Sequence, residues 1–114
     1  AIVAALGAVD VGQGAVVANG LCLAVEALPG TDAMLRGVAD MPLSLRPKGG
    51  VFYKAAKPGQ DLRIDLPTLG PATVELAAKA GLSGIAFQAG GVICLDLPQM
   101  IALASARGLF LWAR

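Results

Sequence analysis

The sequence predicts an α/β (α+β) domain in which helices pack on a mixed sheet. Short β-prone runs alternate with segments of helical periodicity, and 56% of the 114 residues are hydrophobic, which supplies a core for one domain. The chain is also punctuated by 15 Gly and 7 Pro, which keep each element short. The same composition excludes a disordered chain, because disorder requires low hydrophobicity and high net charge.

The first elements predicted are a β-hairpin, a helix and a strand. Asn19-Gly20 separates two β-prone runs and is typical of a type I′ turn, which needs φ > 0 at both central residues. A helix is expected over 33–41, capped by Thr31 or Asp32, and a strand within 51–57. The apolar face of that helix would consist of Met34, Leu35 and Val38.

The second half of the chain repeats this order. The elements expected there are an irregular segment over 57–70, a helix over 71–81, a hairpin over 84–97 that turns at Gly90-Gly91, a helix over 97–107 stopped by Gly108, and a strand over 109–113. Hairpin, helix and strand therefore occur twice, which predicts two β-β-α-β units.

Composition excludes several classes of function. The longest uncharged runs, 11–25 and 80–95, are shorter than the roughly 20 residues that a membrane-spanning helix needs. The absence of His excludes Ser-His and Cys-His catalysis and His-ligated zinc. A net charge of +1 without a Lys/Arg run predicts that nucleic acid is not a partner. Cys22 and Cys94 lie in apolar runs and are expected to be buried and reduced.

Charged residues are concentrated between positions 54 and 65. In an extended segment Asp61, Arg63 and Asp65 would project to one face, and such carboxylates favour a hard cation, Mg²⁺ or Mn²⁺. Lys54 and Lys57, with Arg63, supply the positive charge that phosphate recognition requires. This inventory suits phosphoryl transfer. A solvated surface loop is the alternative interpretation.

Other polar residues are weaker candidates. Thr31 and Asp32 follow Gly30 at a helix start, where backbone N–H groups could bind an anion, although an ordinary N-cap is the favoured explanation. Glu26 ends a strand next to an apolar run, and Asp10 lies beside glycines that allow close backbone approach.

Five segments of the chain, in the same order, resemble the C-terminal domain of the LpxI-type UDP-2,3-diacylglucosamine pyrophosphatases. They are DVGQ (10–13), LAVEALPGTDAML (23–35), GGVFYKAAKPGQDLRIDLPTLG (49–70), AGLSGIAFQAG (80–90) and GLF (108–110). The resemblance implies hydrolysis of UDP-2,3-diacylglucosamine to 2,3-diacylglucosamine 1-phosphate and UMP, with Mg²⁺ or a similar cation, in the lipid A biosynthesis of Gram-negative bacteria.

The resemblance also implies roles for individual residues. Asp61 and Asp65 would hold the metal or the attacking water. The diphosphate would contact Lys54, Lys57, Gln60 and Arg63, with Thr31-Asp32 as a further candidate for the same site. Family members usually carry Glu where this chain has Gln88, and we expect a structural role there.

The expected organisation is residues 1–9 as a linker or helix end from an N-terminal domain and 10–114 as the C-terminal catalytic and lipid-substrate domain, inactive on its own. Partners would be the acylated UDP-sugar, the N-terminal domain and a second copy in a homodimer. The protein would be cytoplasmic, with peripheral contact at the inner membrane. The alternative function is a non-catalytic module for ligand binding or dimerisation.

Overall fold

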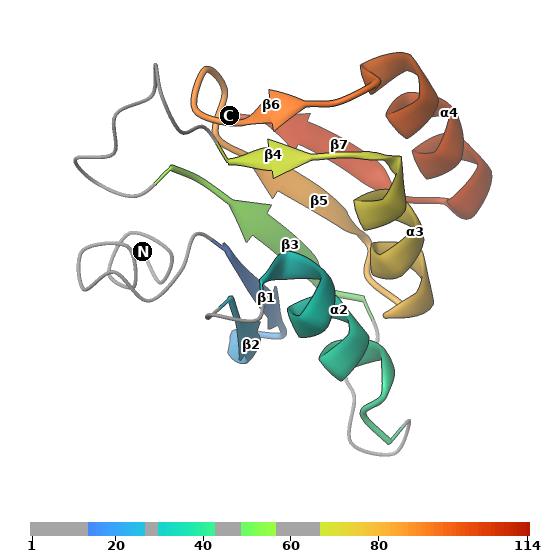
Figure 1. Ribbon diagram of the computed structural model, residues 1–114. Helices are drawn as coiled ribbons and strands as arrows, with labels where there is room; N and C mark the ends of the chain where they lie inside the picture. Colours follow the sequence, from blue (N-terminus) through green and yellow to red (C-terminus); the bar gives the residue numbers. More distant parts are fainter. Residues whose placement is uncertain (1–13, 27–29, 43–48, 57–66) are drawn as a thin grey trace.

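A computed structural model describes residues 14–26, 30–42, 49–56 and 67–114 (Figure 1). The strands of these residues are β1 (Gly14–Ala18), β2 (Leu21–Val25), β3 (Val51–Lys54), β4 (Thr68–Leu69), β5 (Gly84–Phe87), β6 (Ile93–Cys94) and β7 (Phe110–Ala113). The helices are α2 (Thr31–Ala39), α3 (Pro71–Lys79) and α4 (Leu97–Arg107). Together they confirm the predicted α/β fold.

The main sheet has five strands in the order β2-β1-β3-β5-β7. β1 is antiparallel to both β2 and β3, whereas β3 is parallel to β5 and β5 is parallel to β7. Parallel neighbours need a crossover connection, and α3 and α4 lie in the two connections that link these parallel strands. The sheet is therefore mixed, as the sequence predicts.

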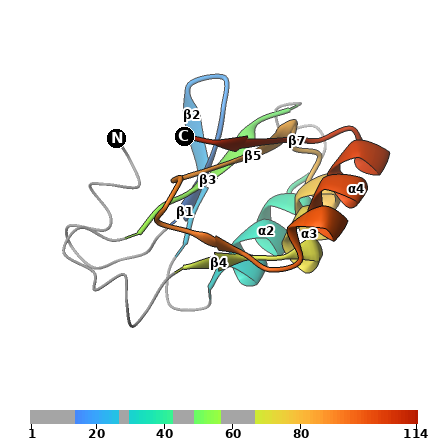
Figure 2. The ribbon, with the colours of Figure 1, turned by 90° about the horizontal axis from the view of Figure 1, so that it is seen from above.

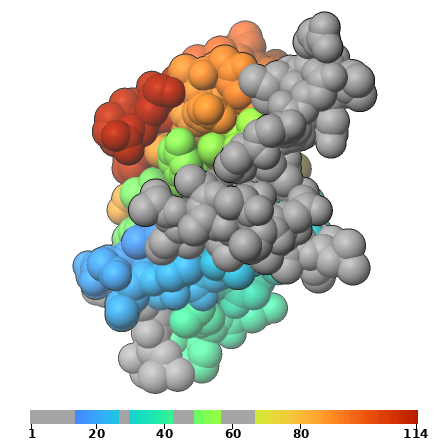
Figure 3. Space-filling model, turned by 90° about the vertical axis from the view of Figure 1, so that its left-hand side faces the viewer, coloured from blue at the N-terminus to red at the C-terminus, as the bar shows by residue number. Residues whose placement is uncertain are grey.

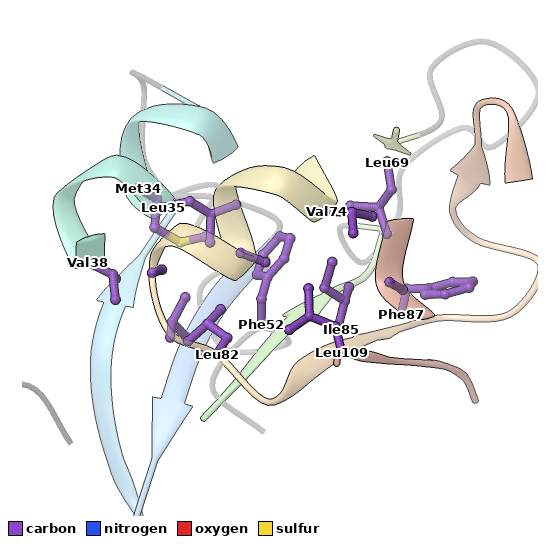
Figure 4. Packing of buried hydrophobic residues seen from close by; sticks show 14 of the residues in the cluster. Met34, Leu35, Val38, Phe52, Leu69, Val74, Leu82, Ile85, Phe87 and Leu109 are labelled. Carbon is purple, nitrogen blue, oxygen red and sulfur yellow. The ribbon is translucent and has the colours of Figure 1, made fainter. Parts of the chain in front are cut away.

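The described helices lie on one side of this sheet (Figure 2). Side chains alternate between the two faces of a strand, so Val16, Phe52 and Ile85 point toward the helices and are fully buried. Leu35 of α2 and Val74 of α3 pack in the same cluster, with the ring of Phe52 near its centre (Figure 4). The core thus extends from the β1–β2 hairpin to the C-terminal part of the chain. These two regions lie apart on the surface shown in Figure 3.

The first predicted hairpin is confirmed. β1 and β2 are joined by Asn19 and Gly20, whose φ angles of 53° and 77° are the positive values that a type I′ turn needs. The ends of two helices also agree with the sequence. Pro71 occupies the first turn of α3, and α4 ends at a left-handed Gly108.

The second predicted hairpin is wrong. β5 pairs with β3 and β7 in the main sheet, and β6 pairs instead with β4 in a separate two-stranded parallel sheet. Gly90 has a φ of 76°, but Gly91 does not share its left-handed conformation. Because every residue of β5 is buried between two parallel neighbours, β6 has no place beside it. The described part of the chain therefore contains one complete β-β-α-β unit, followed by β-α-β crossovers.

The expected N-cap of the first helix is also wrong. α2 begins at Thr31, the N-cap is Gly30, and Asp32 lies in the first turn. The hydroxyl of Thr31 cannot cap the helix because it is hydrogen-bonded to side chains from other elements, as described below.

The cysteines agree only partly with expectation. Cys22 and Cys94 are both free thiols, but neither is buried, because Cys22 is exposed on the edge strand β2 and Cys94 is partly exposed. Burial raises the pKa of the Cys94 thiol. In the described part of the chain, the helices are too short to include a stretch that could cross a membrane.

Candidate functional site

Polar side chains gather at one edge of the main sheet. β2, β3, β5 and β7 all run in the same direction, so their carboxyl ends meet at this edge. Glu26 directly follows β2, Lys54 is the last residue of β3, and Gln88 directly follows β5. In sheets of this kind, ligands bind beside the carboxyl ends of the strands.

A pocket of about 450 Å³ lies next to this edge. It is bordered by the first residues of α2 and α3, the end of β3, and β4. Its lining among the described residues consists of Gly30, Thr31, Asp32, Lys54, Thr68, Leu69, Gly70, Ala72, Thr73 and Leu95. Three of the sequence-predicted site residues, Thr31, Asp32 and Lys54, are therefore brought together here.

Lys54 is the central cation of the pocket, although its side chain is almost wholly buried. Its Nζ donates a hydrogen bond of 3.0 Å to Thr31 Oγ1 and another of 3.0 Å to the carbonyl oxygen of Thr68. A carboxylate oxygen, Glu26 Oε2, lies 3.9 Å from Nζ. An ammonium has three donors, and contacts within the described residues use two of those of Lys54.

Thr31 links Lys54 to Glu26. A lysine ammonium can only donate, so Thr31 Oγ1 accepts from Lys54 and its hydroxyl proton is donated to the Glu26 carboxylate. Glu26 is only 8% exposed, so its charge needs these partners. The three side chains form one chain of hydrogen bonds from cation to hydroxyl to carboxylate.

The backbone fixes Glu26 at the end of the hairpin. Its N–H donates to the carbonyl oxygen of Gly14 at 2.8 Å, which extends the β1–β2 ladder by one residue. A Cβ at Gly14 would lie 2.7 Å from the Phe52 ring and 3.3 Å from Glu26 Oε2. Only glycine therefore lets β1 pass between the core and the buried carboxylate.

Burial lowers the pKa of Lys54, because the charged ammonium loses water, while the charges of Glu26 and Asp32 act in the opposite direction. Glu26 follows β2 and Asp32 lies on α2, so two elements oppose the effect of burial. The site thus holds a cation whose charge depends on its two neighbouring carboxylates.

Two helices start at the pocket. The N-cap residues are Gly30 for α2 and Gly70 for α3, and neither has a side chain that could cap the helix. In α2 the first intrahelical donor is Met34, which bonds to Gly30 O, so the preceding N–H groups of the first turn have no partner in the helix. Helix N-termini carry partial positive charge, and together with Lys54 they favour an anion such as phosphate.

The remaining predicted site residues lie outside the described residues. These are Lys57, Gln60, Asp61, Arg63 and Asp65. Described residues before and after segment 57–66 do lie at the site. Lys54 precedes this segment, Thr68 follows it, and Lys54 Nζ donates a hydrogen bond to Thr68 O. No cluster of three or more His, Cys, Asp or Glu side chains occurs within 14–26, 30–42, 49–56 and 67–114. The metal site expected at Asp61 and Asp65 lies outside these ranges and stays a prediction.

Sequence reasoning missed part of the site. Thr68, Gly70 and Thr73 were not expected there, and Glu26 was noted without a role. A carboxylate directly after a strand of mostly apolar residues was the available signal for Glu26.

Gln88 has a structural contact at this edge. Its Oε1 accepts a hydrogen bond of 3.0 Å from the N–H of Ala56, and its own N–H donates to Lys54 O at 3.0 Å. The side chain therefore ties the end of β5 to the residues that follow β3.

Comparison with known proteins then decides the family. The model of the LpxI C-terminal domain matches residues 1–112. The chain belongs to this family. Within it, the UDP-2,3-diacylglucosamine pyrophosphatase LpxI of Caulobacter vibrioides is 53% identical over 109 residues, which covers 92% of this chain. This LpxI C-terminal domain spans 39% of the length of that relative.

Proposed function

We propose that the intact protein hydrolyses UDP-2,3-diacylglucosamine to 2,3-diacylglucosamine 1-phosphate and UMP in lipid A biosynthesis, and that this chain holds the diphosphate. The assignment of the diphosphate to this chain rests on one observation: the buried Lys54 borders the same pocket as the N-termini of α2 and α3. The name of the Caulobacter relative supports the first part.

The pocket suits a phosphate for electrostatic reasons. Lys54 supplies a positive charge in a site of restricted solvent access, where charge interactions are stronger than in water. The first turns of α2 and α3 add backbone donors that need no reorganisation when an anion enters. Charge accumulates on phosphate oxygens as a phosphoryl group is transferred, so these groups would stabilise the transition state.

The proposal assigns further roles to residues 57–66 from their chemistry and the family resemblance. Asp61 and Asp65 would hold Mg²⁺ or Mn²⁺ and position the attacking water, since hard cations prefer oxygen ligands. When bound, the cation would neutralise charge on the phosphate oxygens. Lys57, Gln60 and Arg63 would contact the diphosphate beside Lys54.

The remainder of the relative's length supports a second partner. Because this chain spans 39% of the Caulobacter protein, we propose that an N-terminal domain completes nucleotide binding and that the C-terminal domain alone is inactive. A cytoplasmic location, peripheral contact with the inner membrane and a homodimer belong to the same proposal.

The test is UMP release by the intact protein in the presence and absence of Mg²⁺. Asp61→Asn and Asp65→Asn should each lower kcat/KM by about 100-fold or more, which is the typical effect of losing one transition-state contact. Lys54→Met should do the same. Asp40→Asn and Lys79→Met are matched controls, because both residues are exposed on the helices away from the pocket lining.

Two results would contradict the proposal. If UMP release is undetectable in the wild-type protein, the function is wrong. If release survives Asp61→Asn and Asp65→Asn unchanged, the chemistry lies elsewhere.

A binding or dimerisation module remains the second candidate. It is favoured by the apolar side chains that α4 and β7 leave exposed, among them Ile101 and Trp112, each 54% exposed. Such surface is typical of an interface. A protein of this kind would bind the acylated UDP-sugar, or a second copy, without releasing UMP.

A further inference from the structure

We infer that Glu26 is a positioning residue of the phosphate site, which acts through Thr31 to keep one N–H of the Lys54 ammonium directed into the pocket. This inference rests on the proposed function, because it assigns a task to Lys54 in holding the diphosphate. Glu26 itself is absent from the pocket lining of the described residues, so its action is indirect.

The charges of Glu26 and Lys54 lie close together without a direct hydrogen bond. Glu26 Oε2 lies 3.9 Å from Lys54 Nζ, which is close enough for strong attraction but too long for a hydrogen bond. A direct hydrogen bond would use the third Lys54 donor and turn it away from the pocket. With Thr31 between them, the carboxylate compensates the buried positive charge without using that donor itself.

The hydroxyl of Thr31 also needs Glu26 for its own orientation. A threonine hydroxyl rotates to suit its partners, and it can accept from Lys54 only when its proton points elsewhere. The Glu26 carboxylate takes that proton and so fixes the acceptor side of Oγ1 toward Lys54. Thr68 O accepts a second Lys54 proton, so the ammonium is held at two points and its rotation is restricted.

Glu26 is held in place independently of any ligand. The ladder bond from its N–H to Gly14 O positions the backbone, and the missing Cβ of Gly14 leaves room for the carboxylate beside Phe52. A buried acid that only stabilised the fold would explain the same packing. The two roles differ in how the activity of the enzyme responds to pH.

The test uses the intact protein with the variant Glu26→Gln, which keeps an oxygen acceptor for Thr31 but removes the charge. Without that charge, burial still lowers the pKa of Lys54, and Asp32 is the one carboxylate of the described residues that still raises it. The alkaline limb of kcat/KM for UMP release should move to lower pH by about one unit, the lower end of the effect of a nearby opposite charge. A purely structural role would lower the melting temperature and leave the limb in place.

A second pair of variants tests the hydroxyl alone. Thr31→Val keeps the charge of Glu26 and the shape of the side chain but removes the hydroxyl, so kcat/KM should fall about tenfold, the effect of one lost charge-assisted hydrogen bond. Thr31→Ser should restore most of the loss. An unchanged pH profile in Glu26→Gln, or equal kcat/KM in Thr31→Val and Thr31→Ser, would overturn the inference. If Glu26→Gln does not fold, the Thr31 pair decides.

Binding of inorganic pyrophosphate to the intact protein separates this inference from the proposed function. Calorimetry should show that Glu26→Gln weakens pyrophosphate binding more at pH 9 than at pH 7, by up to about tenfold if the pKa of Lys54 falls by one unit. A wild-type protein that binds pyrophosphate in this way without UMP release would refute the proposed function and leave the inference standing. Equal weakening at both pH values would refute the inference.

Discussion

Gln88, directly after β5, accepts a hydrogen bond of 3.0 Å from the backbone N–H of Ala56. Ala56 is the last described residue before the segment 57–66, which carries five of the predicted site residues. The contact therefore anchors the backbone on one side of the segment where the chemistry is proposed. A Glu at this position would offer the same kind of acceptor oxygen.

The first prediction concerns this contact. Gln88→Ala should lower the free energy of unfolding by up to about 1 kcal/mol, the usual net value of one hydrogen bond, and should lower UMP release as well. Gln88→Glu should retain both. Urea unfolding and steady-state kinetics of the intact protein measure the two effects. If Gln88→Glu behaves like Gln88→Ala, the amide itself is required and the acceptor role is wrong.

The second prediction compares a glycine in a crowded position, Gly14, with one in open space, Gly37. Gly14→Ala places a Cβ 2.7 Å from the buried Phe52 ring, so it should destabilise the protein by about 1–3 kcal/mol, as overpacking does. Gly37 lies in α2 with no atom within 4 Å of a new Cβ. Gly37→Ala should therefore stabilise by about 0.5–1 kcal/mol through helix propensity. Equal effects of the two changes in urea unfolding would contradict this structure of β1.

The third prediction concerns the ion pair between α3 and α4. Arg107 Nε and Nη2 donate to Oε1 and Oε2 of Glu75 at 3.0 and 3.2 Å. Both groups are accessible to solvent, so the pair should contribute little, and its contribution should fall as salt screens it. A double-mutant cycle with Glu75→Gln and Arg107→Gln, at low and high NaCl, measures the coupling. A coupling that salt leaves unchanged would show that packing, not charge, joins the helices.

Local signals were enough to predict much of the fold. Asn19-Gly20 needs only its own φ preferences to form a hairpin turn, and Pro71 and Gly108 mark helix ends through their own backbone geometry. The second hairpin failed because Gly90-Gly91 fits several turns, and the choice was made by burial of β5 between two parallel strands. That burial depends on partners distant in the sequence.

The site was less predictable for the same reason. Thr31 has the right type and place for an N-cap, and only its contact with Lys54, 23 residues away, assigns its hydroxyl to another task. The role of Glu26 likewise depends on a hairpin, a helix start and a strand end that meet at one edge. Residue types along the chain show which groups are available, whereas their tasks follow from the topology.

The last prediction concerns the pH dependence of stability. Burial lowers the pKa of Lys54 in the folded protein, so between that lowered pKa and the ordinary lysine range the unfolded chain binds more protons than the folded one. Stability should therefore rise with pH in this window, and the cost of burying the ammonium is fully present below it. Urea unfolding from neutral to alkaline pH should show the wild type gaining stability relative to the double variant Lys54→Met/Glu26→Gln, which lacks both buried charges.

Lys79→Met is the control in the same series, because it removes an exposed lysine and reports the effect of surface charge alone. The comparison has a second use. Deprotonation of Lys54 should raise stability but remove the cation that binds phosphate, so stability and kcat/KM should change in opposite directions over the same pH window. Parallel changes in the two quantities would mean that Lys54 is not the group responsible for both.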